Sequence, residues 1–238
     1  MDKEYAQKLI DKTKQDYKSL AKEFSATRAF SWQELEDLVK FIKPNQNVLD
    51  AGCGNGRLYQ LLKNKNIKYL GIDNSEALIN EAKTKYQFGN FRQMDLLDQH
   101  FEAETFDIIF CIAALQHIPS KEFRLQVLRD FYHILKPNSY LLMTNWNLWQ
   151  AKYFWQTIKY SFLSIAGKHK ELDLKDVYMP WKARFGVVDR YYHAFTKKEL
   201  ASLLQEVGFK VEDQYYVKKG EKSNWRNGYN LITIAKKI

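Results

Sequence analysis

Apolar and polar residues follow two patterns along this chain. In some segments apolar residues recur with the period of a helix, and in others they form short continuous runs. Helical patterning dominates residues 3–23. The capping box Ser31-Trp-Gln-Glu34 predicts a second helix, which ends near Ile42 because Pro44 closes it. Two helices are therefore expected before the first apolar run.

A regular succession of strands and helices follows between residues 44 and 145. Segments with a helical period separate apolar runs of strand length, and this order indicates a parallel sheet with helices on both faces. The predicted strands are 47–50, 68–72, 91–94, 106–112 and 139–145. The predicted helices are 56–64, 75–86 and 121–135.

The regular succession of predicted strands and helices ends at Asn145. Residues 146–190 form a long aromatic and basic insertion with no clear strand. A second capping box, Thr196-Lys-Lys-Glu199, predicts a helix that ends before Gly208. Two further strands are expected at 209–217 and 229–236, separated by a polar loop from Gly220 to Gly228.

Composition narrows the class of protein. Hydrophobic residues make up 45% of the 238 residues, as in an ordinary globular protein, and no apolar run reaches the roughly 18 residues of a membrane span. The N-terminus has no signal-peptide core. The two cysteines, Cys53 and Cys111, are interpreted as free thiols in a reducing compartment. We therefore expect a cytoplasmic protein.

Positive charge is concentrated at the C-terminal end. The net charge is +9, and residues 146–238 supply +8 of it, with seventeen Lys and Arg against nine Asp and Glu. Four of the six tryptophans, Trp146, Trp149, Trp155 and Trp181, lie in the same region among lysines. Basic and aromatic groups mixed in this way suit a nucleic acid with stackable bases. The alternative is a surface that merely reflects a lysine-rich proteome.

The most informative short stretch is Val48-Leu-Asp-Ala-Gly-Cys-Gly-Asn-Gly56. Asp50 comes directly after an apolar run, and Gly52, Gly54 and Gly56 follow it at alternate positions. Such a turn lets a ligand approach bare backbone, and a helix beginning near Asn55 would add free N–H groups. The dinucleotide fingerprint does not fit, because its third glycine would fall on an arginine.

This acidic-x-G-x-G-x-G pattern resembles the first motif of the class I S-adenosylmethionine (SAM) methyltransferases. The resemblance implies SAM as cofactor and S-adenosylhomocysteine as product. It also implies an α/β, Rossmann-like domain whose mostly parallel sheet has seven strands, the last one reversed. A structural turn in another α/β domain is the alternative. The expected parts of the single domain are a helical cap (1–43), a SAM-binding core (44–145), the insertion (146–195) and a C-terminal helix with strands (196–238). The cofactor contacts expected in this motif are Asp50, Gly52, Cys53, Gly54, Asn55 and Gly56.

Residues at the carboxyl ends of the later strands suit other parts of SAM, because ligands of such sheets bind at that edge. Asp73 can accept hydrogen bonds from both ribose hydroxyls, although it could also be the N-cap of the next helix. Asp95 can accept from the adenine amino group, or it could be a turn residue. Leu96 offers a backbone N–H and an apolar wall. The cofactor contacts predicted here are Asp73, Asn74, Asp95, Leu96 and Cys111.

Methyl transfer from a sulfonium requires in-line positioning, and a weakly acidic acceptor also requires a base. His117 is the one candidate base near the site in sequence. It could instead donate to the substrate or pack at the helix entry, and we favour a packing or cofactor-side role.

Several longer stretches resemble one family, the eukaryotic methyltransferases that esterify the carboxymethyl group of wobble uridine in tRNA. The methyltransferase domain of the AlkB-type tRNA hydroxylase belongs with them. The Thr-Arg and Arg-Tyr-Tyr-His elements are the most specific, and the resemblance runs from about residue 20 to the C-terminus. The matching stretches are Phe24-Ser-Ala-Thr-Arg28 with Trp32, Leu49 to Gly56, Ile112 to Ile118, Arg190-Tyr-Tyr-His-Ala-Phe195 and Asn224-Trp225.

The resemblance implies tRNA as substrate and a small activator protein as a possible partner, with no membrane and no metal. It implies that Arg28 faces the catalytic pocket and pairs with a carboxylate of the acceptor or of SAM. It also implies that Arg190, Tyr191, His193 and Trp225 line the acceptor entrance. A buried junction between the insertion and the sheet is the alternative for these four.

This chain departs from the family at Gln116-His117, where two adjacent histidines are common. The acceptor group therefore stays open between a carboxymethyl, an amine and another group of a modified uridine. Two other functions remain as alternatives, a small-molecule O- or N-methyltransferase and a SAM-binding regulatory module without turnover.

Overall fold

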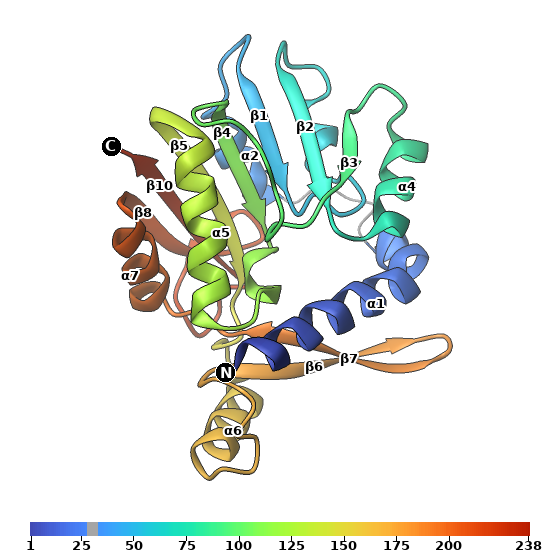
Figure 1. The fold of residues 1–238 in the computed structure, drawn as a ribbon, viewed down its shortest axis with the longest axis vertical. Coiled ribbons are helices and arrows are strands. Elements are labelled where there is room, and N and C mark those ends of the chain that lie inside the picture. The colour runs from blue at the N-terminus through green and yellow to red at the C-terminus, as the bar shows by residue number, and fades with distance from the viewer. Residues whose placement is uncertain (28–32) are drawn as a thin grey trace.

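A sheet of eight strands forms the centre of the computed structural model, which describes residues 1–27 and 33–238 (Figure 1). The strands are β1 (Asn47–Ala51), β2 (Lys68–Asp73), β3 (Phe91–Gln93), β4 (Phe106–Ile112), β5 (Leu135–Trp146), β8 (Phe209–Lys218), β9 (Glu221–Ser223) and β10 (Asn230–Lys237). Their order across the sheet is β3-β2-β1-β4-β5-β10-β8-β9.

Strands β1 to β5 pair in parallel, whereas β10 runs antiparallel to both of its neighbours, β5 and β8. The predicted parallel sheet with a reversed last strand is therefore confirmed. Because parallel strands end at the same edge, the residues that follow β1, β2, β3 and β4 are brought together there.

The predicted number of seven strands is wrong, because β9 adds an eighth. It pairs with β8 so that Lys218 lies opposite Glu221, which leaves a loop of Lys219 and Gly220. Both loop residues have positive φ, +53° and +84°, as a tight hairpin turn requires. The polar composition of the Gly220–Gly228 segment hid this short edge strand.

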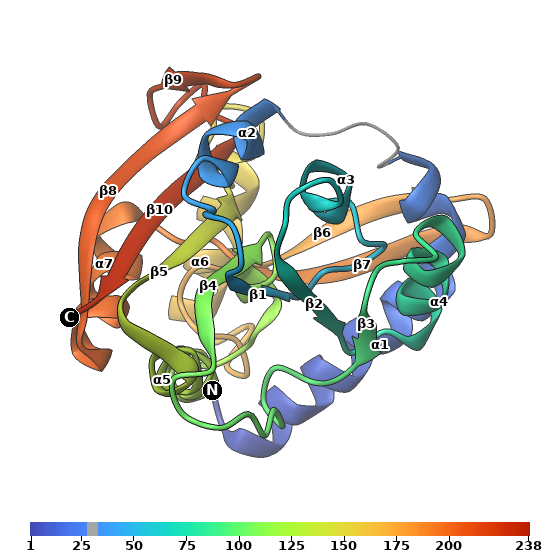
Figure 2. The same ribbon diagram turned by 90° about the horizontal axis from the view of Figure 1, so that it is seen from above.

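Helices cover both faces of the sheet, as predicted. Helices α1 (Lys3–Thr27), α5 (Lys121–Ile134) and α7 (Lys197–Val207) contribute to one apolar core. Helices α2 (Gln33–Val39), α3 (Tyr59–Leu62) and α4 (Glu76–Lys85) contribute to the other. Figure 2 shows α2 and α3 on one side of the sheet and α5 and α7 on the other.

The two predicted capping boxes have different outcomes. Thr196 caps α7, because its hydroxyl accepts a hydrogen bond from the backbone N–H of Glu199 at 3.3 Å. The same helix ends at Gly208, whose φ of +112° only glycine adopts readily. The box that begins at Ser31 lies outside the described residues.

The insertion contains regular structure that the sequence pattern did not reveal. Helix α6 (Phe154–Ile165) is followed by β6 (Asp176–Ala183) and β7 (Gly186–His193), which form a separate antiparallel hairpin. Val177 and Met179 pack in one apolar cluster, while Tyr178 on the other face packs against a second cluster and is partly buried. Because both faces carry large side chains, the alternation that marks a strand is absent.

The turn after β1 does not lead directly into a helix, contrary to the prediction of 56–64. Gly56 has a φ of +74°, and helix α3 covers only Tyr59–Leu62. A Cβ at Gly56 would lie 2.8 Å from the ring of Phe91, so this glycine fits the neighbouring aromatic cluster. The predicted helix start at Asn55 is therefore wrong.

Helix α1 and the β6–β7 hairpin lie beyond the carboxyl ends of the parallel strands, at the bottom of Figure 1. Helix α1 contacts both α4 and β7, so it bridges the sheet and the hairpin. Within the described residues, no helix has the length and apolar character needed to cross a membrane. The N-terminal helix and the insertion thus cover the edge at which the predicted site residues meet.

Candidate functional site

A cavity of about 1200 Å³ lies at this covered edge. The turn after β1 and the ends of β2 and β4 form one part of its wall, and α1 with the hairpin forms another. The predicted site residues that line it are Asp50, Gly52, Cys53, Gly54, Asn55, Asp73, Asn74, Asp95, Leu96, His117 and Arg190.

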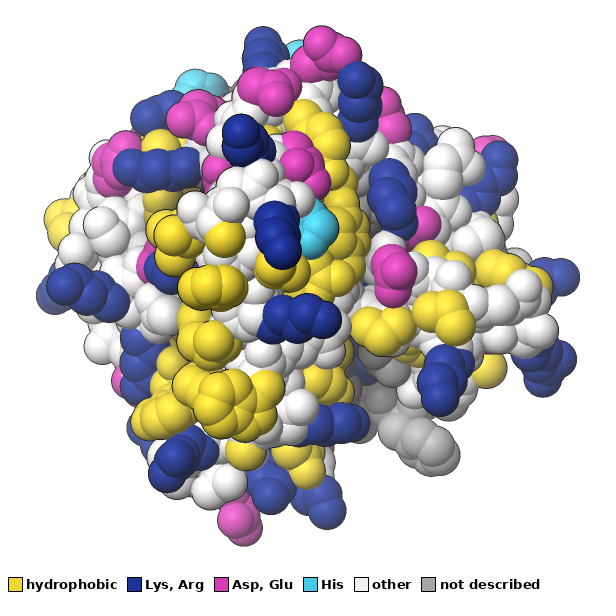
Figure 3. Space-filling model, turned by 90° about the horizontal axis from the view of Figure 1, so that it is seen from below, with side chains coloured by type: hydrophobic (Ala, Val, Ile, Leu, Met, Phe, Trp, Pro, Cys, Tyr) yellow, Lys and Arg dark blue, Asp and Glu magenta, His cyan; other side chains and the backbone are white. Residues whose placement is uncertain are grey.

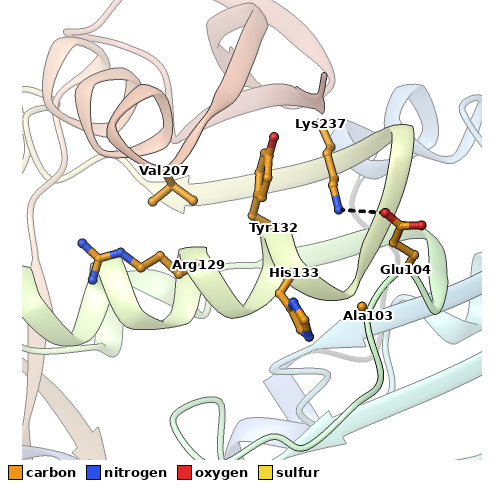
Figure 4. Close-up of a pocket in the computed structure, with 7 residues that line it drawn as sticks. All are labelled: Ala103, Glu104, Arg129, Tyr132, His133, Val207 and Lys237. Carbon is orange, nitrogen blue, oxygen red and sulfur yellow. Dashed lines mark ion pairs between the residues drawn. The ribbon is translucent and has the colours of Figure 1, made fainter.

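A smaller hollow of about 280 Å³ lies near the amino end of β4, between α5 and α7 (Figure 4). Lys237 and Glu104 face each other there, with 3.8 Å between the ammonium nitrogen and a carboxylate oxygen. None of the predicted site residues lines this hollow. The chemistry expected from the sequence is therefore concentrated in the large cavity.

Gly52 brings the turn against the segment that follows β4. Its φ is +77°, and an added Cβ would lie 2.3 Å from the Cβ of Ala114. Ala113 and Ala114 both line the cavity, and Ala113 also has a positive φ of 54°. Close packing of the turn against the segment after β4 therefore requires glycine at position 52, and both segments contribute small groups to the cavity wall.

Asp73 is fixed by two backbone donors. Its carboxylate oxygens accept hydrogen bonds from the N–H groups of Gly54 and Ser75, each at 2.9 Å. Burial is the main reason that the pKa of Asp73 is raised to about 6, against the lowering effect of these two bonds. The carboxylate therefore ties the glycine turn to the end of β2, and its remaining lone pairs can accept from a ligand.

Asp50 carries an acceptor without a donor. One carboxylate oxygen accepts from the hydroxyl of Tyr69 at 2.8 Å, whereas the other is buried without a hydrogen-bond partner. The pKa of Asp50 is raised to about 7, mainly by burial; the hydrogen bond from Tyr69 acts to lower it and the nearby Asp73 acts to raise it. A buried, unsatisfied carboxylate oxygen on a cavity wall fits a ligand that brings a cationic or N–H donor.

The other predicted cofactor residues divide into two groups. Asp95 accepts from the backbone N–H of Leu97 at 3.0 Å, and Leu96 is buried on the cavity wall. Cys111 and Gly56 do not line the cavity, contrary to the prediction. Cys111 is fully buried in the core under α5, where burial raises the pKa of its thiol to about 12.

His117 is neutral and both of its nitrogens are engaged. Nδ1 lies 3.0 Å from the carbonyl oxygen of Tyr191, which can only accept, so Nδ1 carries the hydrogen. Nε2 then accepts from the hydroxyl of Tyr17 at 3.1 Å. Burial, with a contribution from Arg190, lowers the pKa of His117 to about 3. This environment suits the packing or cofactor-side interpretation better than that of a general base.

Arg190 contacts Tyr17, the same residue that donates to His117. Its Nη1 donates to the hydroxyl of Tyr17 at 3.3 Å, and its guanidinium carbon lies 4.6 Å from the ring centre of Trp181 and 5.2 Å from that of Tyr192. The side chain is 5% exposed, and its Nε has no hydrogen-bond partner. Within the described residues, no carboxylate lies within 4 Å of this guanidinium.

Tyr191 and His193 do not reach the cavity. The Tyr191 hydroxyl donates to Asp176 at 2.8 Å, and His193 lies between Asp176 at 2.7 Å and Glu199 at 2.8 Å. Both side chains are buried, and Glu199 belongs to α7. These two residues therefore lie in a buried junction between the hairpin and α7, which was the alternative interpretation, and not at the acceptor entrance.

Trp225 and Arg28 complete the predicted set. Trp225 is 44% exposed on the loop between β9 and β10, and its backbone carbonyl accepts from Asn147 at 2.7 Å. Its side chain does not line the cavity, although Tyr229 of the same loop and Lys219 of the turn between β8 and β9 do. Arg28 lies outside the described residues.

Several lining aromatics were not predicted from the sequence as site residues. Tyr17 comes from α1, and Trp146, Tyr153, Trp181 and Tyr192 come from β5 and the insertion. The aromatic density of the insertion was a usable signal, but it did not distinguish side chains that face the cavity from those that face solvent.

Comparison with known proteins assigns the fold and its site to a family. A sequence profile described as a methyltransferase domain matches residues 22–214, which is most of the chain. The chain belongs to this family of methyltransferases. SAM is its cofactor, as in the solved SAM-dependent methyltransferases that share the fold.

Named relatives of this methyltransferase include two yeast enzymes called tRNA (carboxymethyluridine(34)-5-O)-methyltransferase. The one from Schizosaccharomyces pombe is 27% identical over 231 residues, which covers 89% of this chain and 92% of the relative. The one from Saccharomyces cerevisiae is 29% identical over 165 residues, 69% of this chain and 54% of the relative. The chain spans only 31% of the length of the Arabidopsis thaliana relative of the same name.

Solved structures share the fold of this methyltransferase. A SAM-dependent methyltransferase from Methanosarcina mazei has a TM-score of 0.68 at 21% identity, covering 85% of this chain and 97% of that one. A Haloferax volcanii methyltransferase solved in complex with the Trm112 activator has a TM-score of 0.65 at 14% identity, covering 94% and 96%.

The cavity of this methyltransferase fits SAM on two independent observations. The Gly52 turn presents backbone without a side chain on the cavity wall, and the unpartnered oxygen of Asp50 suits the ammonium of the methionine moiety. Asp73 is placed to accept from ribose hydroxyls. When bound, SAM supplies an electrophilic methyl group. In residues 1–27 and 33–238, no group of three or more His, Cys, Asp or Glu side chains could hold a metal ion.

Gly52→Ala is expected to weaken SAM binding at least about tenfold and to lower the melting temperature, because the new Cβ meets Ala114 and disfavours the positive φ. Gly186→Ala is the matched control. Gly186 also has a positive φ, but nothing lies within 4 Å of its added Cβ. Calorimetry should show weak SAM binding only for Gly52→Ala. Equal SAM affinity in both variants would remove the turn from the cofactor site.

SAM affinity is expected to rise with pH. The pKa values of Asp50 and Asp73 lie above the usual carboxyl value, so in the free protein their ionisation between pH 4 and 7 disfavours folding. SAM donates hydrogen bonds to the ionised carboxylates of Asp50 and Asp73. At low pH these groups are protonated in the free protein, so SAM binding must release their protons. The Kd should therefore fall by about ten- to a hundredfold from about pH 5.5 to pH 8. Titration calorimetry in buffers of different ionisation enthalpy measures both effects, and a constant Kd would contradict the assigned contacts.

Proposed function

We propose that this methyltransferase transfers the methyl group of SAM to the carboxylate of a carboxymethyl-type modified uridine in tRNA. The observation that carries the proposal is the guanidinium of Arg190. It is buried on the cavity wall beside the cofactor site, and no carboxylate of the described residues forms an ion pair with it; Asp16 acts on it only from a longer distance.

A buried cation without a counter-ion is unfavourable, and an anionic ligand would relieve that penalty. An acceptor carboxylate can do so with two parallel hydrogen bonds, a geometry that the arginine fork suits. The rings of Trp181 and Tyr192 hold the fork in place, and Tyr17 occupies one of its donors. The Tyr192 hydroxyl is a second hydrogen-bond partner, and the buried Nε has none.

The state of His117 supports the same acceptor. A carboxylate is ionised at neutral pH and attacks the methyl group without losing a proton, so no general base is needed. A hydroxyl or ammonium acceptor would need one. The neutral His117, whose lone pair already accepts from Tyr17, is poorly suited to that task. The site therefore matches ester formation better than the alternatives left open by the sequence.

Aromatic side chains around the cavity support a nucleoside as the carrier of that carboxylate. Trp146 stacks edge-on against Tyr153 and Tyr192, with ring centres 4.8 and 5.1 Å apart, and all three line the cavity. Lys152 and Lys219 lie on the same wall. Rings and cations together suit a base and its phosphates. The names of the yeast relatives support the same substrate class.

In the proposed mechanism the chain acts mainly by positioning. The Gly52 turn with Ala113 and Ala114 holds the methyl donor at one side of the cavity, and Arg190 holds the acceptor carboxylate at the other. Tyr17 links Arg190 to His117 and keeps the guanidinium from turning away. Fixing both reactants in line removes most of the entropic barrier to transfer. We include a small activator subunit in the proposal, because a fold neighbour was solved with one.

Trp225→Ala is expected to weaken tRNA binding by about 1–3 kcal/mol, the usual value of one base stacked on an aromatic ring, without changing SAM affinity. Trp225 is exposed on the loop between β9 and β10, and Tyr229 of the same loop lines the cavity. Phe88→Ala is the control, because Phe88 is 95% exposed and lies between α4 and β3. Fluorescence anisotropy with labelled tRNA gives both affinities. Equal tRNA binding by the two variants would exclude Trp225 from the entrance.

Mass spectrometry of tRNA nucleosides tests the proposed function in the cell. Total tRNA from a strain without the gene should accumulate the carboxymethyl nucleoside and lack its methyl ester. Expression of the wild-type chain should restore the ester. Unchanged nucleosides, together with a missing methylated small molecule in the same extract, would support a small-molecule methyltransferase instead.

A further inference from the structure

Helix α6 presents apolar side chains to solvent at the far end of the insertion (Figure 1). Trp155 is 77% exposed, Phe162 66%, Ile165 72% and Ile158 38%. Figure 3, which views the molecule from this end, shows hydrophobic side chains gathered between lysines and arginines. We call these four residues the α6 seam. Exposed apolar groups that are contiguous commonly mark an interaction surface.

The α6 seam does not attach the helix to its own domain. The opposite face does so: Thr157 is fully buried, Gln156 donates to the carbonyl of Tyr178 at 2.7 Å, and Ser164 donates to the carbonyl of Leu172 at 2.8 Å. Helix α6 is thus already anchored through its polar face, and its apolar face remains without a partner in the described part of the chain.

The spacing of the seam residues along the helix indicates which kind of element packs against them. Its members follow one another at intervals of three, four and three residues, which are the a and d positions of a heptad. This pattern gives a narrow stripe that packs against another helix rather than a broad face that packs on a sheet. A nucleic acid fits less well, since two of the four residues are isoleucines, which offer no ring for a base to stack on.

The charges around the α6 seam indicate which charge its partner should carry. Helix α6 contains no acidic residue. Lys159 is exposed beside the seam, and Lys152 and Lys168 are exposed beyond its two ends. Two copies of α6 packed together would bring lysines against lysines, which opposes self-association. Glutamates flanking the apolar stripe of a different helix would instead pair with them.

We propose that the α6 seam docks the apolar stripe of an acidic amphipathic helix from a partner protein. Trp155 and Phe162 are its central anchors, because large aromatic side chains carry most of the binding energy at such interfaces. The lysines set the orientation and the salt dependence of the contact. This surface is separate from the cavity, since none of the four seam residues lines it.

The test uses the full chain and a synthetic peptide of about three heptads with Leu at a and d and Glu at e and g. A second peptide with Lys at e and g is the charge control. Titration of each labelled peptide should show binding of the acidic one only, with affinity falling as salt rises. Phe162→Ser should raise its Kd at least about tenfold, whereas Phe88→Ser should leave it unchanged. Lys159→Glu should also weaken it.

Four outcomes would overturn the proposal. They are no binding of the acidic peptide, equal binding of both peptides, self-association of the chain that Phe162→Ser abolishes, and loss of tRNA affinity on Phe162→Ser without any peptide binding. Circular dichroism and melting temperature check that each variant is folded. SAM affinity should be unchanged in all of them, because the seam lies outside the cavity.

Discussion

Replacing Arg190 with methionine is expected to lower kcat/KM for tRNA by about thirtyfold to several thousandfold. This range corresponds to the roughly 2–5 kcal/mol lost when one partner of a buried charge pair is removed. The variant should keep its SAM affinity. Arg190→Lys should recover only part of the loss, because an ammonium cannot form the two parallel hydrogen bonds of a guanidinium.

The same substitution is expected to leave the stability of the folded protein nearly unchanged. In the ligand-free state Arg190 is buried beside Tyr17, Trp181 and Tyr192, and within the described residues no carboxylate forms an ion pair with it. Replacing Arg190 with an apolar side chain of similar length removes its desolvation penalty but also its contacts with Tyr17 and Tyr192, and the two effects oppose each other. An unchanged or higher melting temperature with lost activity would identify a binding role rather than a structural one.

Arg184→Met is the matched control, because Arg184 is exposed on the same hairpin. It should keep both activity and SAM affinity. Two results would contradict the role of Arg190: full activity of Arg190→Met, or an equal loss of SAM and tRNA binding. The second result would mean that the guanidinium pairs with the carboxylate of SAM instead of the acceptor.

Replacing Asp73 with alanine is expected to weaken SAM binding by about 1–3 kcal/mol, or roughly five- to 150-fold. The carboxylate accepts from Gly54 and Ser75 and lies on the cavity wall, so its loss removes the ribose acceptor and loosens the glycine turn. Isothermal titration calorimetry at about pH 8, where Asp73 is ionised, gives the largest difference between variant and wild type.

Asp98→Ala controls for the loss of one negative charge, because Asp98 is exposed and pairs only with the exposed His100. It should bind SAM like the wild-type chain. Unaltered SAM affinity of Asp73→Ala would show that the ribose lies elsewhere in the cavity. A strongly lowered melting temperature of free Asp73→Ala would instead reveal a mainly structural role.

The sheet was predictable because parallel strands buried on both faces produce continuous apolar runs. The run at 106–112 coincides with β4, and the strands on either side begin or end within a few residues of their predictions, except the start of β5 at Leu135. The polar residues Lys136 and Asn138 concealed that early start. Asp50 and Asp73 were found for the same reason, since strand ends fix their place at one edge.

The acceptor side was less predictable, because it depends on contacts between distant parts of the chain. Tyr17 and Arg190 are 173 positions apart, and nothing in the helical pattern of the first 23 residues indicates which side chains of α1 face the cavity. Tyr191 and His193 share a motif with Arg190 but point to Asp176 instead. Alternation along β7 sends neighbouring side chains to opposite faces, so a shared motif did not mean a shared site.

The most direct measurement of the proposed reaction follows the chemical stability of the transferred methyl group. The chain, with an activator if needed, is incubated with methyl-labelled SAM and tRNA from a strain that lacks the gene, and the recovered tRNA is treated with mild alkali. A methyl ester is cleaved by alkali, so the label should enter tRNA and then leave it as methanol. Label that stays on the RNA after alkali, or no label in RNA at all, would contradict ester formation on a modified uridine.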